Sequence, residues 1–124
     1  MEQLTTHHDQ TKGRVMEVAM LMKKVKLNLS REELSAFGRI LSSYLANMPF
    51  YSIYEKSLFF ILYQVYETKI RKKAITMKSE YKISLDMSQA WAVAEMLEEM
   101  DLDLFPYEYN LQRVIISEID HQTV

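Results

Sequence analysis

The chain has 124 residues, of which 48% are hydrophobic and 26% are charged, and its formal net charge at pH 7 is −2. This composition fits one globular domain and excludes an intrinsically disordered chain, and the absence of cysteine excludes a disulfide scaffold and thiol catalysis. Because there are only two glycines and two prolines, long regular elements are expected, and we interpret residues 1–124 as a single, mainly α-helical domain.

The N-terminal part of the chain divides into an arm and a helix. Residues 1–10 are polar and show no hydrophobic period, which predicts a flexible arm. Between residues 11 and 24 apolar side chains recur at helical spacing, at Val15, Val18, Ala19 and Met22. Charged residues interrupt every apolar run in this part, so no signal peptide is indicated, and we expect a cytoplasmic protein that does not bind a membrane.

A short strand and a helix follow. Residues 25–29 alternate strictly between apolar and polar side chains, which predicts a strand with one buried face. Ser30 and Glu33 have the spacing of a capping box, in which two side chains satisfy the free N–H groups of a helix start. A helix is therefore expected from Arg31 to the turn before Pro49.

A third helix contains the most apolar stretch of the chain. Ser52 and Glu55 form a second capping box, which predicts a helix from Ile53 that continues through Lys73. Within it the stretch from Ser57 to Tyr66 carries no charge and has apolar side chains on both faces. A helix that is apolar all round is buried on all sides, and ten residues are about half of the ~20 that cross a bilayer. The stretch predicts either the central helix of the core or the seam of a homodimer.

Residues 81–120 repeat the pattern of residues 25–67. Tyr81–Asp86 has the alternation and the N-cap residue of Val25–Ser30, and Gln89 takes the place of Glu33. Any two amphipathic helical hairpins share part of such a pattern, but the joint match of strand and caps favours a real repeat. We therefore predict two strand-helix-helix units, about five helices with the N-terminal one, and pairing of the two strands in a short antiparallel ribbon about a pseudo-twofold axis.

The charge is distributed unevenly along the chain. Residues 69–82 carry six basic side chains against one acidic, a balance of +5, and residues 83–124 carry nine acidic side chains against one basic, a balance of −8. A basic cluster beside aromatic residues can bind nucleic acid. Lysines at the C-terminal end of a helix also have a purely structural role, because their charge stabilises the negative end of the helix dipole. The candidate nucleic-acid residues are Lys69, Arg71, Lys72, Lys73, Lys78 and Lys82.

The acidic C-terminal part and the aromatic side chains point to protein partners. Acidic side chains close together create a negative field that attracts a basic partner, and exposed aromatic side chains are enriched at interfaces. The candidate partner-binding residues are Glu98, Glu99, Asp101, Asp103, Tyr51, Tyr54 and Trp91.

No catalytic, cofactor-binding or metal-binding motif is present, since neither glycine has a second glycine nearby and no His-Glu-x-x-His or calcium loop occurs. We therefore expect a non-enzymatic interaction or regulatory accessory module that binds an unidentified protein and self-associates as a homodimer. One alternative is a nucleic-acid-binding accessory protein that uses residues 69–82. A further alternative is an inhibitor that blocks a nucleic-acid-binding enzyme with its acidic C-terminal part.

Overall fold

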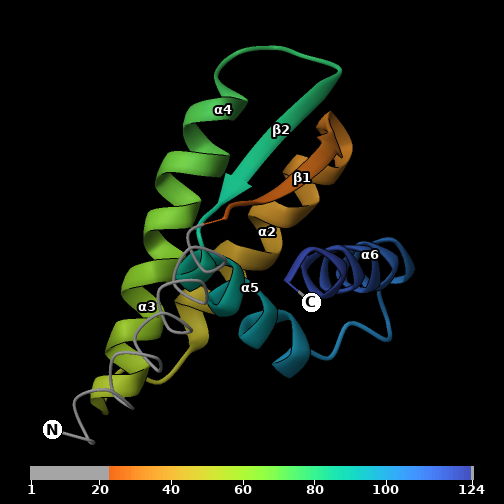
Figure 1. The fold of residues 1–124 in the computed structure, drawn as a ribbon. Coiled ribbons are helices and arrows are strands. Elements are labelled where there is room, and N and C mark those ends of the chain that lie inside the picture. Colours follow the sequence, from red (N-terminus) through yellow and green to blue (C-terminus); the bar gives the residue numbers. More distant parts are fainter. Residues whose placement is uncertain (1–22, 124) are drawn as a thin grey trace, which may run out of the picture.

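The computed structural model describes residues 23–123 (Figure 1). The elements are β1 (Val25–Ser30), α2 (Arg31–Asn47), α3 (Ile53–Val65), the π-helix η1 (Tyr66–Arg71), α4 (Lys72–Ala74), β2 (Glu80–Leu85), α5 (Met87–Glu99) and α6 (Pro106–Thr123). Because α3, η1 and α4 follow one another without a break, the described part of the chain contains four helices and a two-stranded sheet. The mainly helical class expected from the sequence is confirmed.

The arm expected over residues 1–10 and most of the helix expected over residues 11–24 lie outside the described residues. Lys23 and Lys24 are described, and neither belongs to a helix. The prediction that this helix extends to Lys24 is therefore wrong, and the described residues do not contain a fifth helix.

The two strands lie side by side and antiparallel, as expected from their alternation. Val25 is opposite Leu85, and Leu27 is opposite Ile83. The apolar side chains of both strands point to the helices and are buried, while Lys26, Asn28 and Lys82 on the other face are exposed. The prediction that residues 25–29 and 81–85 are neighbours, with Leu27 and Ile83 facing the helices, is confirmed.

Helix side chains cover both outer edges of this ribbon. Gln122 of α6 accepts a hydrogen bond from the backbone N–H of Lys26 at 2.8 Å and donates one to the carbonyl oxygen of the same residue at 2.7 Å. On the other edge Lys73 Nζ of α4 donates to the carbonyl oxygen of Lys82 at 2.6 Å. These bonds occupy backbone N–H and C=O groups that could otherwise pair with a strand of another chain.

Local capping fixes where three of the helices begin. In each, the N-cap side chain accepts a hydrogen bond from the backbone of the third helical residue, whose own side chain accepts one from the N-cap backbone. The pairs are Ser30 with Glu33 in α2, Ser52 with Glu55 in α3 and Asp86 with Gln89 in α5. The predicted starts at Arg31 and Ile53 are confirmed, and α2 ends before Pro49 as expected.

The π-helical segment η1 changes which residues of the long helix face the core. A regular α-helix would bring Lys69, four residues after the buried Val65, back to the buried face. In η1 the backbone N–H of Lys72 instead donates to the carbonyl oxygen of Glu67, five residues earlier, which adds one residue to the turn. The extra residue shifts the helix phase by about 100°, so the apolar Ile70 is buried there.

The stretch from Ser57 to Tyr66 is buried on one side only. Leu58 and Leu62 are buried, but Phe60 is 73% exposed and Tyr63 is 49% exposed. The first alternative, a core helix enclosed on all sides, is therefore wrong, and the second, the seam of a homodimer, stays a prediction. The physical reason is that α2 and α5 pack against the side of α3 that carries Leu58 and Leu62, while Phe60 and Tyr63 remain exposed.

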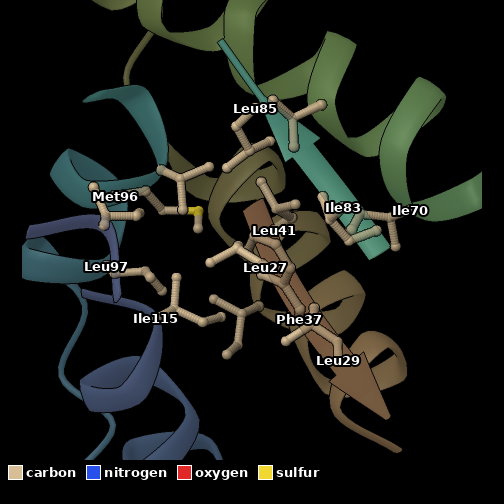
Figure 2. Packing of buried hydrophobic residues seen from close by; sticks show 14 of the residues in the cluster. Leu27, Leu29, Phe37, Leu41, Ile70, Ile83, Leu85, Met96, Leu97 and Ile115 are labelled. Atoms are coloured by element: carbon tan, nitrogen blue, oxygen red, sulfur yellow. The ribbon is translucent and has the colours of Figure 1, made fainter. Parts of the chain in front are cut away.

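The core lies between the ribbon and the four helices. Figure 2 shows Leu27 and Leu29 of β1, Ile83 and Leu85 of β2, Phe37 and Leu41 of α2, Ile70 of η1, Met96 and Leu97 of α5 and Ile115 of α6 converging on this space. α2 packs against both the long helix and α6, and α5 packs against both α3 and α6. This arrangement leaves the outward sides of α2, α3 and α5 as surfaces for other molecules.

Candidate interaction surfaces

Exposed large apolar side chains, most of them aromatic, occur in the turn before α3, around α3 and on the adjacent side of α5. We call this set the aromatic face. Its members are the exposed large apolar side chains Phe50, Tyr51, Ile53, Tyr54, Phe60, Tyr63 and Trp91. Monomeric proteins rarely expose large contiguous apolar surfaces unless they serve binding.

Ring contacts hold much of the aromatic face in place. The ring centroids of Phe50 and Phe59 lie 5.0 Å apart in an edge-to-face arrangement, and Phe59 is stacked on Tyr63 at 6.2 Å. Tyr54 of α3 meets Trp91 of α5 edge to face at 6.0 Å. Aromatic side chains that are already ordered lose little conformational entropy when a partner binds.

Acidic side chains of α5 form one rim of the aromatic face. Tyr54 Oη donates to Glu95 Oε2 at 3.0 Å, and Tyr44 Oη of α2 donates to Glu99 Oε2 at 2.6 Å. Burial, followed by the hydrogen bond to Glu99, raises the pKa of Tyr44 well above its ordinary value. The hydrogen bond to Glu95 is the main reason that the pKa of Tyr54 is raised. Both tyrosines therefore remain neutral donors that fix the two carboxylates beside the rings.

The structure brings together part of the predicted partner-binding set. Tyr54 and Trp91 are in contact, and Glu99 lies beside them in the corner formed by α2, α3 and α5. Tyr51 is 89% exposed in the turn before α3, where its backbone N–H donates to Glu55.

The remaining predicted acids lie at the end of α5 and beyond it. Glu98 is exposed in the last turn of α5, and Asp101 and Asp103 are exposed in the following loop. There Asp101 Oδ1 accepts a hydrogen bond from the backbone N–H of Asp103 at 3.1 Å.

Sequence reasoning missed Ile53, Phe60 and Tyr63. Their signal was available, because these positions lie on the side of a helical wheel opposite Leu58 and Leu62. For Phe60 and Tyr63 the expectation of all-round burial over Ser57–Tyr66 hides this signal, whereas Ile53 lies outside that stretch.

Four of the six candidate nucleic-acid residues gather around one pocket of about 410 Å³ between the end of α4 and β2. Lys72, Lys73, Lys78 and Lys82 line it together with Thr76, Glu80 and Tyr81. The other two lie elsewhere: Arg71 forms an ion pair with Glu67 at 2.8 Å and points to the α2 side, and Lys69 is half-buried on η1.

A larger groove, of about 700 Å³, runs between α2 and the η1–α4 part of the long helix. We call it the α2–η1 groove. Its residues are Arg31, Leu34, Ser35, Gly38, Arg39, Ser42, Ser43 and Ala46 of α2, Tyr66, Ile70, Arg71 and Ala74 of η1 and α4, and Met77 and Tyr81 beyond them. No sequence pattern indicated this groove, because it depends on which side of α2 meets which side of η1.

Within residues 23–123 no group of three or more histidine, aspartate or glutamate side chains has a geometry that could hold a metal ion. In the same part of the chain, no helix combines the length and the apolar character needed to cross a membrane. The sequence matches no protein-family model and no curated protein, and no solved structure matches the fold. The function must therefore be inferred from the surfaces themselves.

Proposed function

We propose that this chain is a non-enzymatic interaction module that binds a protein partner, including a second copy of itself, through the aromatic face. The observation that carries the proposal is the set of exposed aromatic rings on α3, on α5 and in the turn before α3, among which Phe60 is 73% and Tyr51 is 89% exposed. Aromatic side chains are the commonest anchors of protein interfaces because they bury much area for few rotatable bonds. The absence of cysteine also fits the cytoplasm, which we retain as part of the proposal.

The surroundings of the aromatic face define the chemistry of the partner. Glu95 and Glu99 line one rim, and Glu98, Asp101 and Asp103 continue the negative charge beyond the end of α5. A partner with apolar side chains surrounded by lysine or arginine fits this surface, and long-range attraction accelerates its association. A basic enzyme that binds nucleic acid is one class of protein with this chemistry.

Self-association is the first test. Sedimentation velocity of the full chain over a wide concentration range measures the oligomer, and Phe60→Ser removes the most exposed aromatic ring of α3. We expect this variant to shift the chain toward the monomer. The matched control is Ile75→Ser, because Ile75 is equally exposed, at 79%, but lies beyond α4 and outside the aromatic face.

Binding of a different protein is tested by affinity purification from the native host with the same two variants as bait. A partner recovered by the unaltered chain and by Ile75→Ser, but lost by Phe60→Ser, supports the proposal. If the unaltered chain stays monomeric at high concentration and recovers no protein that depends on Phe60, the aromatic face is not an interaction surface.

We also infer that the two strand-helix-helix units are an internal repeat. Leu27 pairs with Ile83, its counterpart in the second unit, as a twofold axis through the centre of the ribbon requires. The matched helix positions also share burial: Leu34, Phe37, Ile40 and Leu41 of α2 are buried, and so are Ala90, Val93, Met96 and Leu97 of α5. A sequenced relative in which only one unit occurs, as a homodimer, would support this origin.

A second candidate function is nucleic-acid binding by the lysine-lined pocket, because the turn between α4 and β2 brings four lysines of residues 72–82 around one pocket. The competing explanation is structural, since Lys72 and Lys73 lie in the last turn of a long helix, where they stabilise its dipole, and Lys73 already bonds to Lys82. If the pocket binds nucleic acid, Lys72→Glu with Lys78→Glu abolishes a gel shift that weakens steeply between about 50 and 200 mM salt. Absence of any shift by the unaltered chain at low salt removes this candidate.

A further inference from the structure

The α2–η1 groove lies above the seam between α2 and the long helix and has an apolar floor. Leu34 and Ile70 are buried at its base, and Tyr66, Ala74 and Met77 contribute apolar surface along it. Its volume of about 700 Å³ is within the range of about 300–1,000 Å³ typical of ligand-binding clefts. The groove is thus large enough to receive several side chains of a bound molecule.

The geometry of two elements keeps this groove open and shallow. At Gly38 an added Cβ atom would lie 3.0 Å from Ile70 Cγ2, so the glycine allows α2 and η1 to approach closely at the floor. Near that contact, α2 carries small side chains on this side at Ser35, Ser42 and Ala46, between the longer arginines of the rim. A rigid element of secondary structure can therefore approach α2 closely.

The rim of the groove is positively charged. Three arginines line it, Arg31, Arg39 and Arg71, and none of its lining residues is acidic. Arg39 and Arg71 form exposed ion pairs with Glu108 and Glu67 outside the groove, and exposed pairs of this kind contribute only ~0–1 kcal/mol. An incoming carboxylate can replace them at little cost.

Of the three arginines, Arg31 has the guanidinium group with the fewest polar contacts to the described residues. Its only side-chain hydrogen bond within the described residues is a 3.7 Å contact to the sulfur of Met77, and it forms no ion pair with any residue between 23 and 123.

We propose that the α2–η1 groove binds an acidic amphipathic helix of a second protein. The lining of α2 runs from Arg31 to Ala46, and fifteen helical steps of about 1.5 Å make the groove roughly 22 Å long. That length matches about four helical turns, with apolar side chains at i, i+3/i+4 and i+7 in the groove and carboxylates beside the arginines. With the acid-rimmed aromatic face, the chain then has two docking surfaces of opposite charge and bridges a basic and an acidic partner.

A displayed library of random 16-residue peptides, selected on the full chain, tests this proposal even though the natural partner is unidentified. Ser42→Phe places a bulky side chain in the groove without touching the core, because Ser42 is exposed. The matched control is Ser117→Phe, at an exposed position of α6 outside the groove. We expect the enriched peptides to be acidic, to show the apolar helical period, and to bind Ser117→Phe normally but Ser42→Phe at least about 10-fold more weakly.

Charge reversal on the rim provides the second measurement. Arg31→Glu should weaken the enriched peptides by about 3- to 10-fold in low salt, and the effect should shrink at high salt. Arg113→Glu, an exposed site on α6 that makes the same charge change, should leave binding unchanged.

Three outcomes overturn the proposal: enriched peptides that are basic or lack the helical period, enriched peptides that bind Ser42→Phe as well as the unaltered chain, and a selection that enriches no peptide. A loss of self-association in Ser42→Phe would assign the groove to a second copy instead. Peptides that depend on Phe60 but not on Ser42 would refute the groove while leaving the aromatic face intact.

Discussion

The one-sided burial of α3 makes a quantitative prediction about two neighbouring apolar residues. Leu62 is fully buried, and Phe60, two residues earlier in the same uncharged stretch, is 73% exposed. Leu62→Ala removes three carbon atoms from the core, a transfer cost of ~2.4 kcal/mol at ~0.8 kcal/mol per methylene. The cavity left behind adds to this, so the free energy of unfolding should fall by ~2–5 kcal/mol.

Phe60→Ala should cost much less in the monomer. A fully buried phenylalanine side chain contributes ~1.5–3 kcal/mol, and about a quarter of the Phe60 surface is covered, so the loss should be below about 1 kcal/mol. The assay is urea denaturation followed by Trp91 fluorescence and by circular dichroism, at the lowest protein concentration that gives a signal. Coincidence of the two transitions checks that unfolding is two-state.

Repeating the measurement at high concentration separates folding from association. If the aromatic face joins two copies, the unaltered chain gains stability with concentration, and Phe60→Ala loses that gain while Leu62→Ala keeps it. The reasoning is refuted if Leu62→Ala costs less than about 1 kcal/mol, or if Phe60→Ala costs as much as Leu62→Ala at low concentration.

Three further predictions concern hydrogen bonds. The pKa of Tyr44 is higher in the folded than in the unfolded chain, so the contribution of Tyr44 to the free energy of unfolding is complete below about pH 10 and is lost as the pH rises further. Tyr44→Phe should therefore reduce the fall in the free energy of unfolding at alkaline pH, as measured by denaturation curves at several pH values. Ser30→Ala removes the N-cap of α2 and should cost ~0.5–2 kcal/mol, whereas Ser117→Ala on the surface should cost almost nothing in the same thermal melts. Gln112 is buried and donates to two carbonyl oxygens near the end of α5, so Gln112→Leu should lower stability by ~1–3 kcal/mol in urea; an unchanged midpoint would mean that water replaces these bonds.

The two proposed surfaces differ in the charge around them and therefore fit different partners. The acid-rimmed aromatic face fits a basic partner, and the arginine-rimmed groove fits an acidic one. Since both use the long helix, the first through α3 and the second through η1 and α4, a partner that bends this helix at the π-helical segment would alter both surfaces. Such coupling would be measured as a change in peptide affinity for the groove when the aromatic-face partner is bound. The bound peptide must change the affinity of the aromatic-face partner by the same factor.

The amino-acid sequence by itself determined the features that depend on neighbouring residues. Alternation over residues 25–29 and 81–85 identified both strands, because side chains of a strand point to opposite faces. The capping boxes that begin with Ser30 and Ser52 placed two helix starts correctly, since a cap bonds to the backbone only three residues away. The match between the two units even indicated that the strands pair.

Only the tertiary structure decided which sides of the helices are covered. Composition marked the stretch around Phe60 as apolar, but its exposure depends on α2 and α5 lying on the opposite side of α3. The phase shift in η1 buries Ile70 in place of Lys69, and Ile70 there lies against Gly38, some thirty residues earlier. The groove likewise joins residues that are distant in the sequence, and no local pattern encodes the relative placement of two packed elements.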